Sequence, residues 1–210
     1  MLQFITHEND RYGYFDSAML ALQGGCKWIQ LRMKHAPLDE VREVALKLKE
    51  ECIKHEAILV IDDYVELAVE VEADGVHLGK CDMPPSEARL SMGEKYIIGG
   101  TANTFQDIEA LVKAKVDYIG LGPFRFTKTK EKLSPVLGKE GYADIMQKCR
   151  DKGYTVPIVA IGGITEEDIP EIIGCGVSGI AVSGTIINAE DPVEETKKLI
   201  DILYKSRDGK

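Results

Sequence analysis

Polar and apolar side chains alternate where one short apolar run of the chain ends. Gln30, Arg32 and Lys34 are separated by Leu31 and Met33. Because successive side chains of an extended backbone point to opposite faces, the three polar groups should share one face. Arginine offers a planar fork of donors and lysine a compact charge, a combination that suits a polyanion such as a diphosphate. Rim charges held in ordinary salt bridges would explain the same pattern equally well.

Carboxylates follow the next two apolar runs, at Asp63 and Asp82. Beside an anion site they would repel a diphosphate unless a cation lay between them, and Mg²⁺ is the ion that bridges carboxylates and phosphate oxygens. The pattern therefore predicts Mg²⁺ bound by Asp63 and Asp82. Since Asp62 and Asp63 are adjacent, only one of them should face inward, and we favour Asp63. Alternatively, each aspartate caps the helix that follows it.

Small residues follow the last two apolar runs, as Gly162-Gly163 and Ser183-Gly184. Main-chain N–H groups at such turns can bind a phosphate monoester, although glycines are also common in turns without any ligand. A diphosphate subsite and a monophosphate subsite at one rim suggest group transfer with pyrophosphate as the leaving group.

Eight β-type runs must position these residues, and the 210 residues give about 26 residues for each run. Stretches with helical spacing separate the runs, which predicts parallel strands. An open doubly wound sheet also fits, but the first turn lacks its glycine fingerprint, so we predict a single α/β domain over residues 1–210, a (β/α)8 TIM barrel. The runs are Leu2–Thr6, Trp28–Arg32, Ile58–Asp62, Gly75–Leu78, Tyr96–Gly99, Tyr118–Leu121, Pro157–Ile161 and Gly179–Val182.

The longest interval between runs begins at Gly122 and carries Thr127, Thr129 and Lys130. Long loops in compact domains are usually functional or disordered, and this one starts at the catalytic face of the predicted barrel. His77 lies inside an apolar run, where a structural histidine with satisfied nitrogens is the more common case.

Composition excludes several classes of protein. There are 26 basic and 35 acidic side chains, so a net charge of −9 argues against nucleic acid or anionic lipid as partners. No apolar run is long enough to span a membrane, and the first residues do not have the pattern of a signal peptide. Five scattered cysteines without a CxxC motif favour reduced thiols and a cytoplasmic location. The oligomeric state cannot be inferred.

Four motifs, in this order, resemble those of the thiamine phosphate synthase family, and the resemblance covers nearly the whole chain. They are Gln30–Lys34, Ala73–Gly79 with Asp82, Asp117–Pro123 leading to Thr127–Lys130, and Ala160–Ile164. The resemblance implies a transferase that joins hydroxymethylpyrimidine diphosphate and thiazole phosphate, by a dissociative, Mg²⁺-assisted substitution, into thiamine phosphate and pyrophosphate.

The resemblance also implies roles for individual residues. Arg32, Lys34 and Lys130 would neutralise the departing diphosphate, and Asp63 and Asp82 would bind Mg²⁺. The diphosphate substrate would contact Gln30, Leu31, Arg32, Met33, Lys34, Asp62, Thr101 and Lys130, and the thiazole phosphate would contact Thr127, Lys128, Thr129, Gly163, Val182 and Ser183.

Three positions depart from the family's pattern: Asp62 stands where the family usually has Asn, Lys80 where a Gln is usual, and Thr101-Ala102-Asn103 where Ser-x-His is usual. A thiazole tautomerase would use a histidine for proton transfer in this last region, so Asn103 argues against that paralogue. A barrel prenyltransferase would also pair a Mg²⁺-bound diphosphate with a phosphate monoester, and a ligand-binding homologue without activity would keep the same fold.

Overall fold

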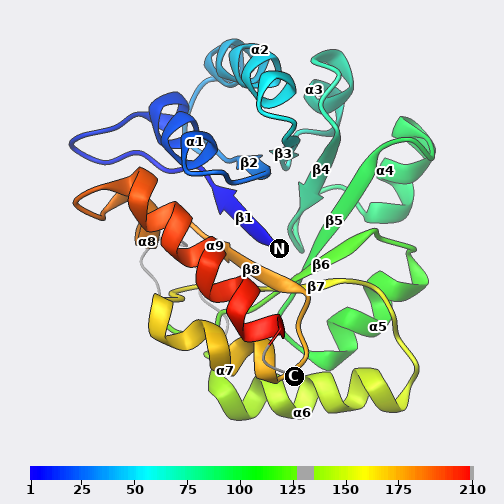
Figure 1. Cartoon of the computed structure of the whole chain (residues 1–210). Coiled ribbons are helices and arrows are strands. Elements are labelled where there is room, and N and C mark those ends of the chain that lie inside the picture. The colour runs from blue at the N-terminus through cyan, green and yellow to red at the C-terminus, as the bar shows by residue number, and fades with distance from the viewer. Residues whose placement is uncertain (127–134, 209–210) are drawn as a thin grey trace.

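Eight parallel strands close into a barrel in the computed structural model, which describes residues 1–126 and 135–208 (Figure 1). Each strand pairs with its neighbours in chain order, and the last pairs with the first, with Leu2 opposite Ile180. This arrangement confirms the predicted (β/α)8 barrel. The strands are β1 (Leu2–Ile5), β2 (Trp28–Leu31), β3 (Ile58–Asp62), β4 (Gly75–Leu78), β5 (Ile97–Ala102), β6 (Tyr118–Leu121), β7 (Ile158–Ile161) and β8 (Gly179–Val182).

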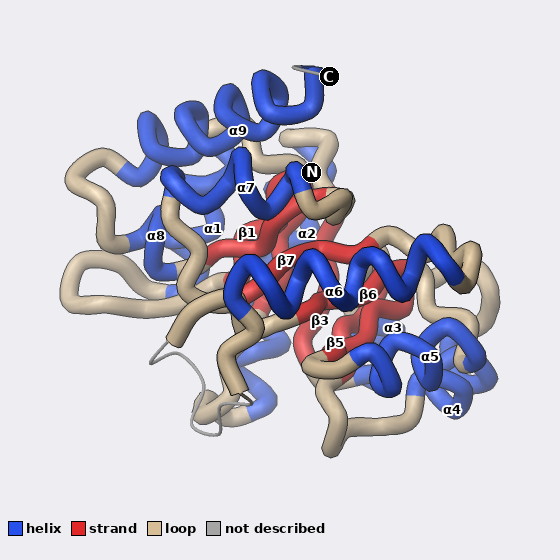
Figure 2. The backbone as a smooth tube through the Cα atoms, turned by 90° about the horizontal axis from the view of Figure 1, so that it is seen from below, coloured by secondary structure: helices blue, strands red, loops and turns tan. Residues whose placement is uncertain are grey.

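Helices surround the strands, and Figure 2 shows α6, α7 and α9 along one side of the barrel. Each connection returns the chain to the amino end of the next strand, so the carboxyl ends of all strands lie at one mouth. The helices are α1 (Tyr14–Gln23), α2 (Leu38–Lys54), α3 (Val65–Glu70), α4 (Pro85–Met92), α5 (Phe105–Lys113), α6 (Gly138–Asp151), the 3₁₀ turn η1 (Glu166–Asp168), α7 (Ile169–Gly174), α8 (Gly184–Ile187) and α9 (Pro192–Asp208).

Two separate apolar layers hold the barrel together. The larger layer lies between strands and helices, and α2 contributes Val41, Ala45, Leu48 and Cys52, which recur every three or four residues. Burying one such leucine stabilises the fold by about 1.5–3 kcal/mol. The smaller layer fills the barrel interior and contains Trp28, Val60, Tyr118, Val159 and Ala181.

The fifth strand is longer than predicted. It continues past Gly99 to Ala102, so that Thr101 lies within the strand and its side chain is buried. A side chain at Gly99 would overlap the ring of Tyr118 on the next strand. The glycine at this position therefore does not end the strand; it leaves space for the ring of Tyr118.

No helix within the described ranges is long and apolar enough to cross a membrane. All five cysteines are free thiols; Cys26, Cys52 and Cys149 are buried, and Cys81 is exposed.

Candidate functional site

The end of β2 carries the first polar cluster of the barrel mouth. Gln30 is buried, and its Nε2 donates to Oδ1 of Asp62 at 2.5 Å. Nε of Arg32 lies 3.5 Å from Oδ2 of the same carboxylate. Leu31 and Met33 are buried in the layer between strands and helices, as strand alternation predicts. Gln30 and Arg32 thus point away from the helices, and both contact Asp62.

Both adjacent aspartates face this site, so the prediction that only one of them does is wrong. Asp62 ends β3 and points to Gln30 and Arg32. Asp63 has a φ of +68°, which takes the chain out of the extended conformation that the prediction assumed. Its Oδ2 lies 3.3 Å from Nζ of Lys34. A left-handed residue directly after the strand turns the second carboxylate to the same side as the first.

Asp82, which follows β4, lies close enough to Asp63 to affect its ionisation. Burial, then the charge of Asp62 and the interaction with Asp82, raise the pKa of Asp63 to about 7, while Lys34 opposes them. Oδ2 of Asp82 accepts the N–H of Gly79 at 2.6 Å.

The alternative role of these aspartates as helix caps is wrong. Tyr64 precedes α3 and Pro84 precedes α4, and neither helix has a side-chain cap. Asp63 pairs instead with Lys34, and Asp82 accepts the main-chain N–H of Gly79.

The donor set of Asp63 and Asp82 fits Mg²⁺ better than a metal that needs a complete protein cage. Within the described residues, no group of three or more His, Cys, Asp or Glu side chains is arranged to hold a metal ion. Mg²⁺ prefers hard oxygen ligands and usually takes one or two carboxylates, with waters and substrate phosphates in the other positions. The neighbouring carboxylates of Asp63 and Asp82 meet that requirement.

The ion pairs at this side of the mouth leave no excess of positive charge. Arg32 and Lys34 stand against three carboxylates, those of Asp62, Asp63 and Asp82. A diphosphate would therefore meet a nearly balanced cluster, and a further cation would be needed to make the field attractive.

The mouth at β7 is built from main chain. Gly162 and Gly163 have φ values of +95° and +65°. A Cβ atom at Gly163 would lie 2.9 Å from the carbonyl oxygen of Phe126, so the turn requires glycine for both its conformation and its packing. Two nitrogens of Arg125 bind the two oxygens of Asp168 at 2.8 Å each, which ties the segment after β6 to the segment after β7.

Ser183 lies between β8 and α8, next to the buried Val182. Its Oγ is inaccessible to solvent and has no hydrogen-bond partner among the described residues. Nearby, Oγ1 of Thr185 donates to the carbonyl of Ile164 at 2.5 Å, joining α8 to the loop after β7. A buried hydroxyl without a partner is uncommon and asks for an explanation.

Some interactions near the site were not found from the sequence. Inside the barrel, the hydroxyl of Tyr118 lies 2.9 Å from Nδ1 of His77 and accepts a hydrogen bond from Gln3. Only one feature of the sequence could have indicated Gln3: it is an amide side chain within an apolar run. Arg125 and Asp168 are 43 residues apart, and nothing in the sequence pairs them.

The predicted contacts of Thr127, Lys128, Thr129 and Lys130 lie outside the described residues. Thr101 lies within the described residues, and its Oγ1 is 2.9 Å from Nε2 of His77, inside the barrel.

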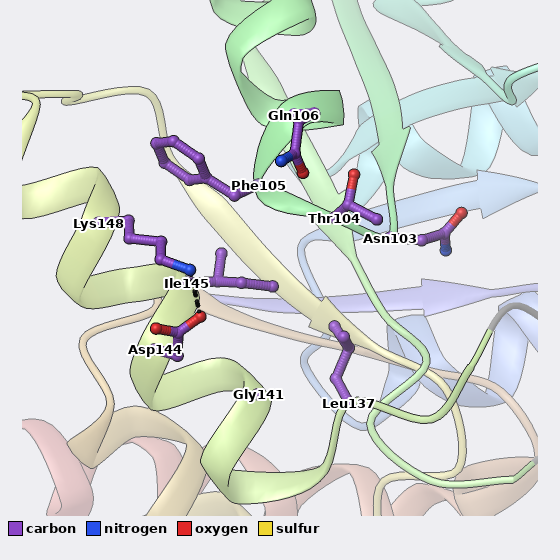
Figure 3. A pocket seen from close by; sticks show the side chains of 9 residues that line it. All are labelled: Asn103, Thr104, Phe105, Gln106, Leu137, Gly141, Asp144, Ile145 and Lys148. Carbon is purple, nitrogen blue, oxygen red and sulfur yellow. Dashed lines mark hydrogen bonds and ion pairs between the residues drawn. The ribbon is translucent and has the colours of Figure 1, made fainter.

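A cavity of about 530 Å³ lies outside the barrel, between the start of α5 and α6 (Figure 3). Phe105 and Lys148 line one side of it, and Asn103 lies at the opposite edge. Nζ of Lys148 is bound to Asp144 at 2.7 Å, so the cavity carries an internally balanced charge pair. It lacks the converging cations of the mouth and is not the anion site.

Comparison with known proteins gives a consistent result. The family model of thiamine monophosphate synthase matches residues 2–186. The chain is 61% identical over 201 residues to thiamine-phosphate synthase of Bacteroides thetaiotaomicron, covering 96% of each chain. It is 46% identical to the Flavobacterium johnsoniae protein of the same name, covering 97% of this chain and 96% of that one.

A solved structure agrees with the sequence comparisons. Thiamine phosphate pyrophosphorylase from Pyrococcus furiosus superimposes with a TM-score of 0.86 at 33% identity, covering 98% of this chain and 96% of the other. The chain therefore belongs to the thiamine monophosphate synthase family of transferases.

Proposed function

We propose that this enzyme joins hydroxymethylpyrimidine diphosphate to a thiazole phosphate, with thiamine phosphate and pyrophosphate as products. The observation that carries the proposal is that two unlike groups of residues lie at one mouth. One consists of Arg32 and Lys34 in ion pairs with the aspartates after β3, and the other of the glycine turn at Gly163 and the buried hydroxyl of Ser183 after β7 and β8.

The diphosphate would bind at the charged side. Gln30, Arg32 and Lys34 project from one strand end, and Lys130 would add a third cation. Leu31 and Met33 would contribute through their main chain, because their side chains are buried against helices. Asp62 would hold Gln30 and Arg32 in place for the substrate.

Asp63 and Asp82 would hold Mg²⁺, which would supply positive charge to the diphosphate and so weaken the bond to the leaving group. Support comes from the oxygen-only donor pair and from the charge balance of the neighbouring ion pairs.

The thiazole phosphate would bind at Gly163, Val182 and Ser183, with Thr127, Lys128 and Thr129 as further contacts. The buried Oγ of Ser183 supports this assignment, because a phosphate oxygen would give it the partner that the described residues lack. The positive φ of Gly163 leaves its backbone open to a close approach.

Bond breaking would precede bond making. The bond between the pyrimidine methylene carbon and the diphosphate oxygen breaks, and its electron pair leaves with pyrophosphate. An electron-rich aminopyrimidine stabilises the resulting cation, and the thiazole nitrogen then donates its lone pair to the methylene carbon. Arg32, Lys34 and Lys130 would stabilise the charge that develops on the leaving group. No protein nucleophile is required.

The tautomerase alternative would need a titrating group after β5. At that place Nδ2 of Asn103 donates to the carbonyl of Gly122 at 2.5 Å, and an amide does not transfer protons near neutral pH. This contact argues against the alternative.

An assay of pyrophosphate and thiamine phosphate tests the proposal. With both substrates and Mg²⁺ we expect the two products in equal amounts, and with EDTA we expect neither above background. Isomerisation of the thiazole phosphate alone, or binding of both substrates without any product, would contradict the proposal.

A further inference from the structure

A continuous chain of hydrogen bonds crosses the interior of the barrel. Gln3 links two branches: its Nε2 donates to Oε1 of Gln30 at 3.1 Å and to the hydroxyl of Tyr118 at 3.3 Å. From Tyr118 the chain continues through His77 to Thr101, with 2.9 Å at each step. The side chains come from β1, β2, β4, β5 and β6, so the chain of bonds links five of the eight strands across the barrel interior.

The direction of this chain is fixed at Asp62. The guanidinium of Arg32 only donates, so Asp62 meets its two neighbours as an acceptor, and Gln30 must donate to it through Nε2. The other end of the Gln30 amide, Oε1, then requires a donor, which is Nε2 of Gln3. The second hydrogen of the same nitrogen goes to the oxygen of Tyr118.

The remaining steps follow from the number of protons. The hydroxyl of Tyr118 accepts from Gln3 and has a single hydrogen, which is available to Nδ1 of His77. Burial raises the pKa of Tyr118, so the phenol keeps that hydrogen. When Nδ1 accepts, the proton of a neutral imidazole is on Nε2, and Nε2 donates to Oγ1 of Thr101.

With His77 in this tautomer, the hydroxyl hydrogen of Thr101 is left over, and it has no acceptor among the described residues. We propose that Gln3, Tyr118 and His77 are positioning residues that hold His77 as the Nε2–H tautomer, so that Thr101 presents its O–H to an oxygen of the diphosphate substrate. This proposal rests on the proposed function, which supplies the anion at Thr101.

The opposite tautomer would give Thr101 the opposite character. If Nδ1 carried the proton, Nε2 would accept, and the hydrogen of Thr101 would be used on His77. Only oxygen lone pairs would then face the substrate, and a diphosphate oxygen cannot donate to them. The same residues would repel the ligand instead of binding it. The tautomer thus decides whether Thr101 is an anion-binding group.

The tautomer can be measured directly on the intact protein with ¹⁵N-labelled histidine. The signals of His77 are assigned by their loss in the His77→Gln variant, and the other three histidines serve as internal references. We expect a proton on Nε2 and none on Nδ1 in the wild type. A ring protonated on Nδ1 alone, or on both nitrogens, would overturn the proposal.

A double-mutant cycle tests the consequence for binding. Thr101→Val removes the donor and Tyr118→Phe removes the group that orients it; each should raise KM for the diphosphate substrate about tenfold and leave KM for the thiazole phosphate unchanged. If Tyr118 acts through Thr101, the double variant should be no worse than Thr101→Val. Thr101→Ser, which keeps the hydroxyl, should restore the wild-type KM. Additive effects in the double variant, or no rescue by serine, would overturn the proposal.

Thr196→Val is the matched control, because Thr196 is fully buried and donates to Pro192 within α9. It deletes the same group away from the mouth and should change neither KM. If the wild type forms no thiamine phosphate, the proposed function fails, whereas the tautomer measured by NMR decides the orientation of His77 without any assay of activity.

Discussion

At the ends of β2, β3 and β4 the barrel mouth is made of charged side chains, whereas at the ends of β7 and β8 it is made of glycines and main chain. On the charged side Arg32 and Lys34 are held by aspartates at 3.5 and 3.3 Å. On the main-chain side Gly162 and Gly163 have positive φ and pack against residues 123–126.

The two constructions respond differently to substitution. The ion pair of Lys34 and Asp63 is partly exposed to solvent. Such pairs contribute little to folding, so a charge there can be neutralised at small cost in stability. A glycine with positive φ in close packing has no such freedom, because any side chain adds both strain and overlap. Substitutions on the charged side should therefore change activity alone, and substitutions on the main-chain side should change activity and stability together.

The largest effect is expected for the carboxylates. Asp63→Asn or Asp82→Asn should lower kcat by about 100-fold or more, because each removes a charged ligand of the proposed Mg²⁺. Thermal unfolding measured on the same samples should change little. Full turnover in EDTA, or a fully active double variant, would show that these residues do not bind a required metal.

Lys130 should give the next largest effect, as a third cation on the leaving group. Lys130→Ala should lower kcat by about 10- to 10³-fold, since a charge-assisted bond that strengthens in the transition state contributes about 2–4 kcal/mol. Lys128→Ala, a substitution of the same type two positions away, should change kcat far less. A larger loss of kcat in Lys128→Ala than in Lys130→Ala would show that Lys128 stabilises the leaving group instead.

The main-chain side is tested with Gly163→Ala. The added methyl group would lie 2.9 Å from the Phe126 carbonyl and 3.1 Å from Cβ of Arg125, at a φ of +65°. We expect a loss of about 1–3 kcal/mol in stability and a higher KM for the thiazole phosphate alone. Gly174→Ala in α7 is the control, because a Cβ atom there has no neighbour within 4 Å. Equal changes in stability and KM for the two variants would show that the turn at Gly163 does not specifically require glycine.

The smallest effect is expected for Asp62→Asn. The asparagine oxygen can still accept from Gln30, so kcat should stay within about threefold of the wild type, while the Mg²⁺ concentration needed for half-maximal activity rises by a similar factor through the loss of a nearby negative charge. Abolished turnover with unchanged folding would instead make the carboxylate itself essential.

The sequence was sufficient to predict the barrel because strands buried on both faces read as short apolar runs, and their number and spacing matched a closed sheet. The end of β5 was misplaced because Gly99 and Gly100 resemble a turn, whereas the first of them only makes space for Tyr118. A pattern of residue types does not show which neighbouring ring requires that space.

Site residues on a single strand could be predicted from the sequence. Contacts between residues of separate strands could not. Alternation placed Gln30, Arg32 and Lys34 correctly, but it misled at Asp63, whose left-handed backbone breaks the alternation. The bond from His77 to Tyr118 links residues 41 positions apart and depends on the register of β4, β5 and β6. Only folding creates that contact.

Calorimetric titration of the two ligand classes tests the central claim, that the mouth contains one metal-dependent subsite and one main-chain subsite. Pyrophosphate and the thiazole phosphate are each titrated into the protein with Mg²⁺ and then with EDTA. The account predicts that chelation weakens pyrophosphate binding at least about tenfold and leaves the affinity for the thiazole phosphate unchanged. Equal loss of both affinities, or no loss of either, would contradict it.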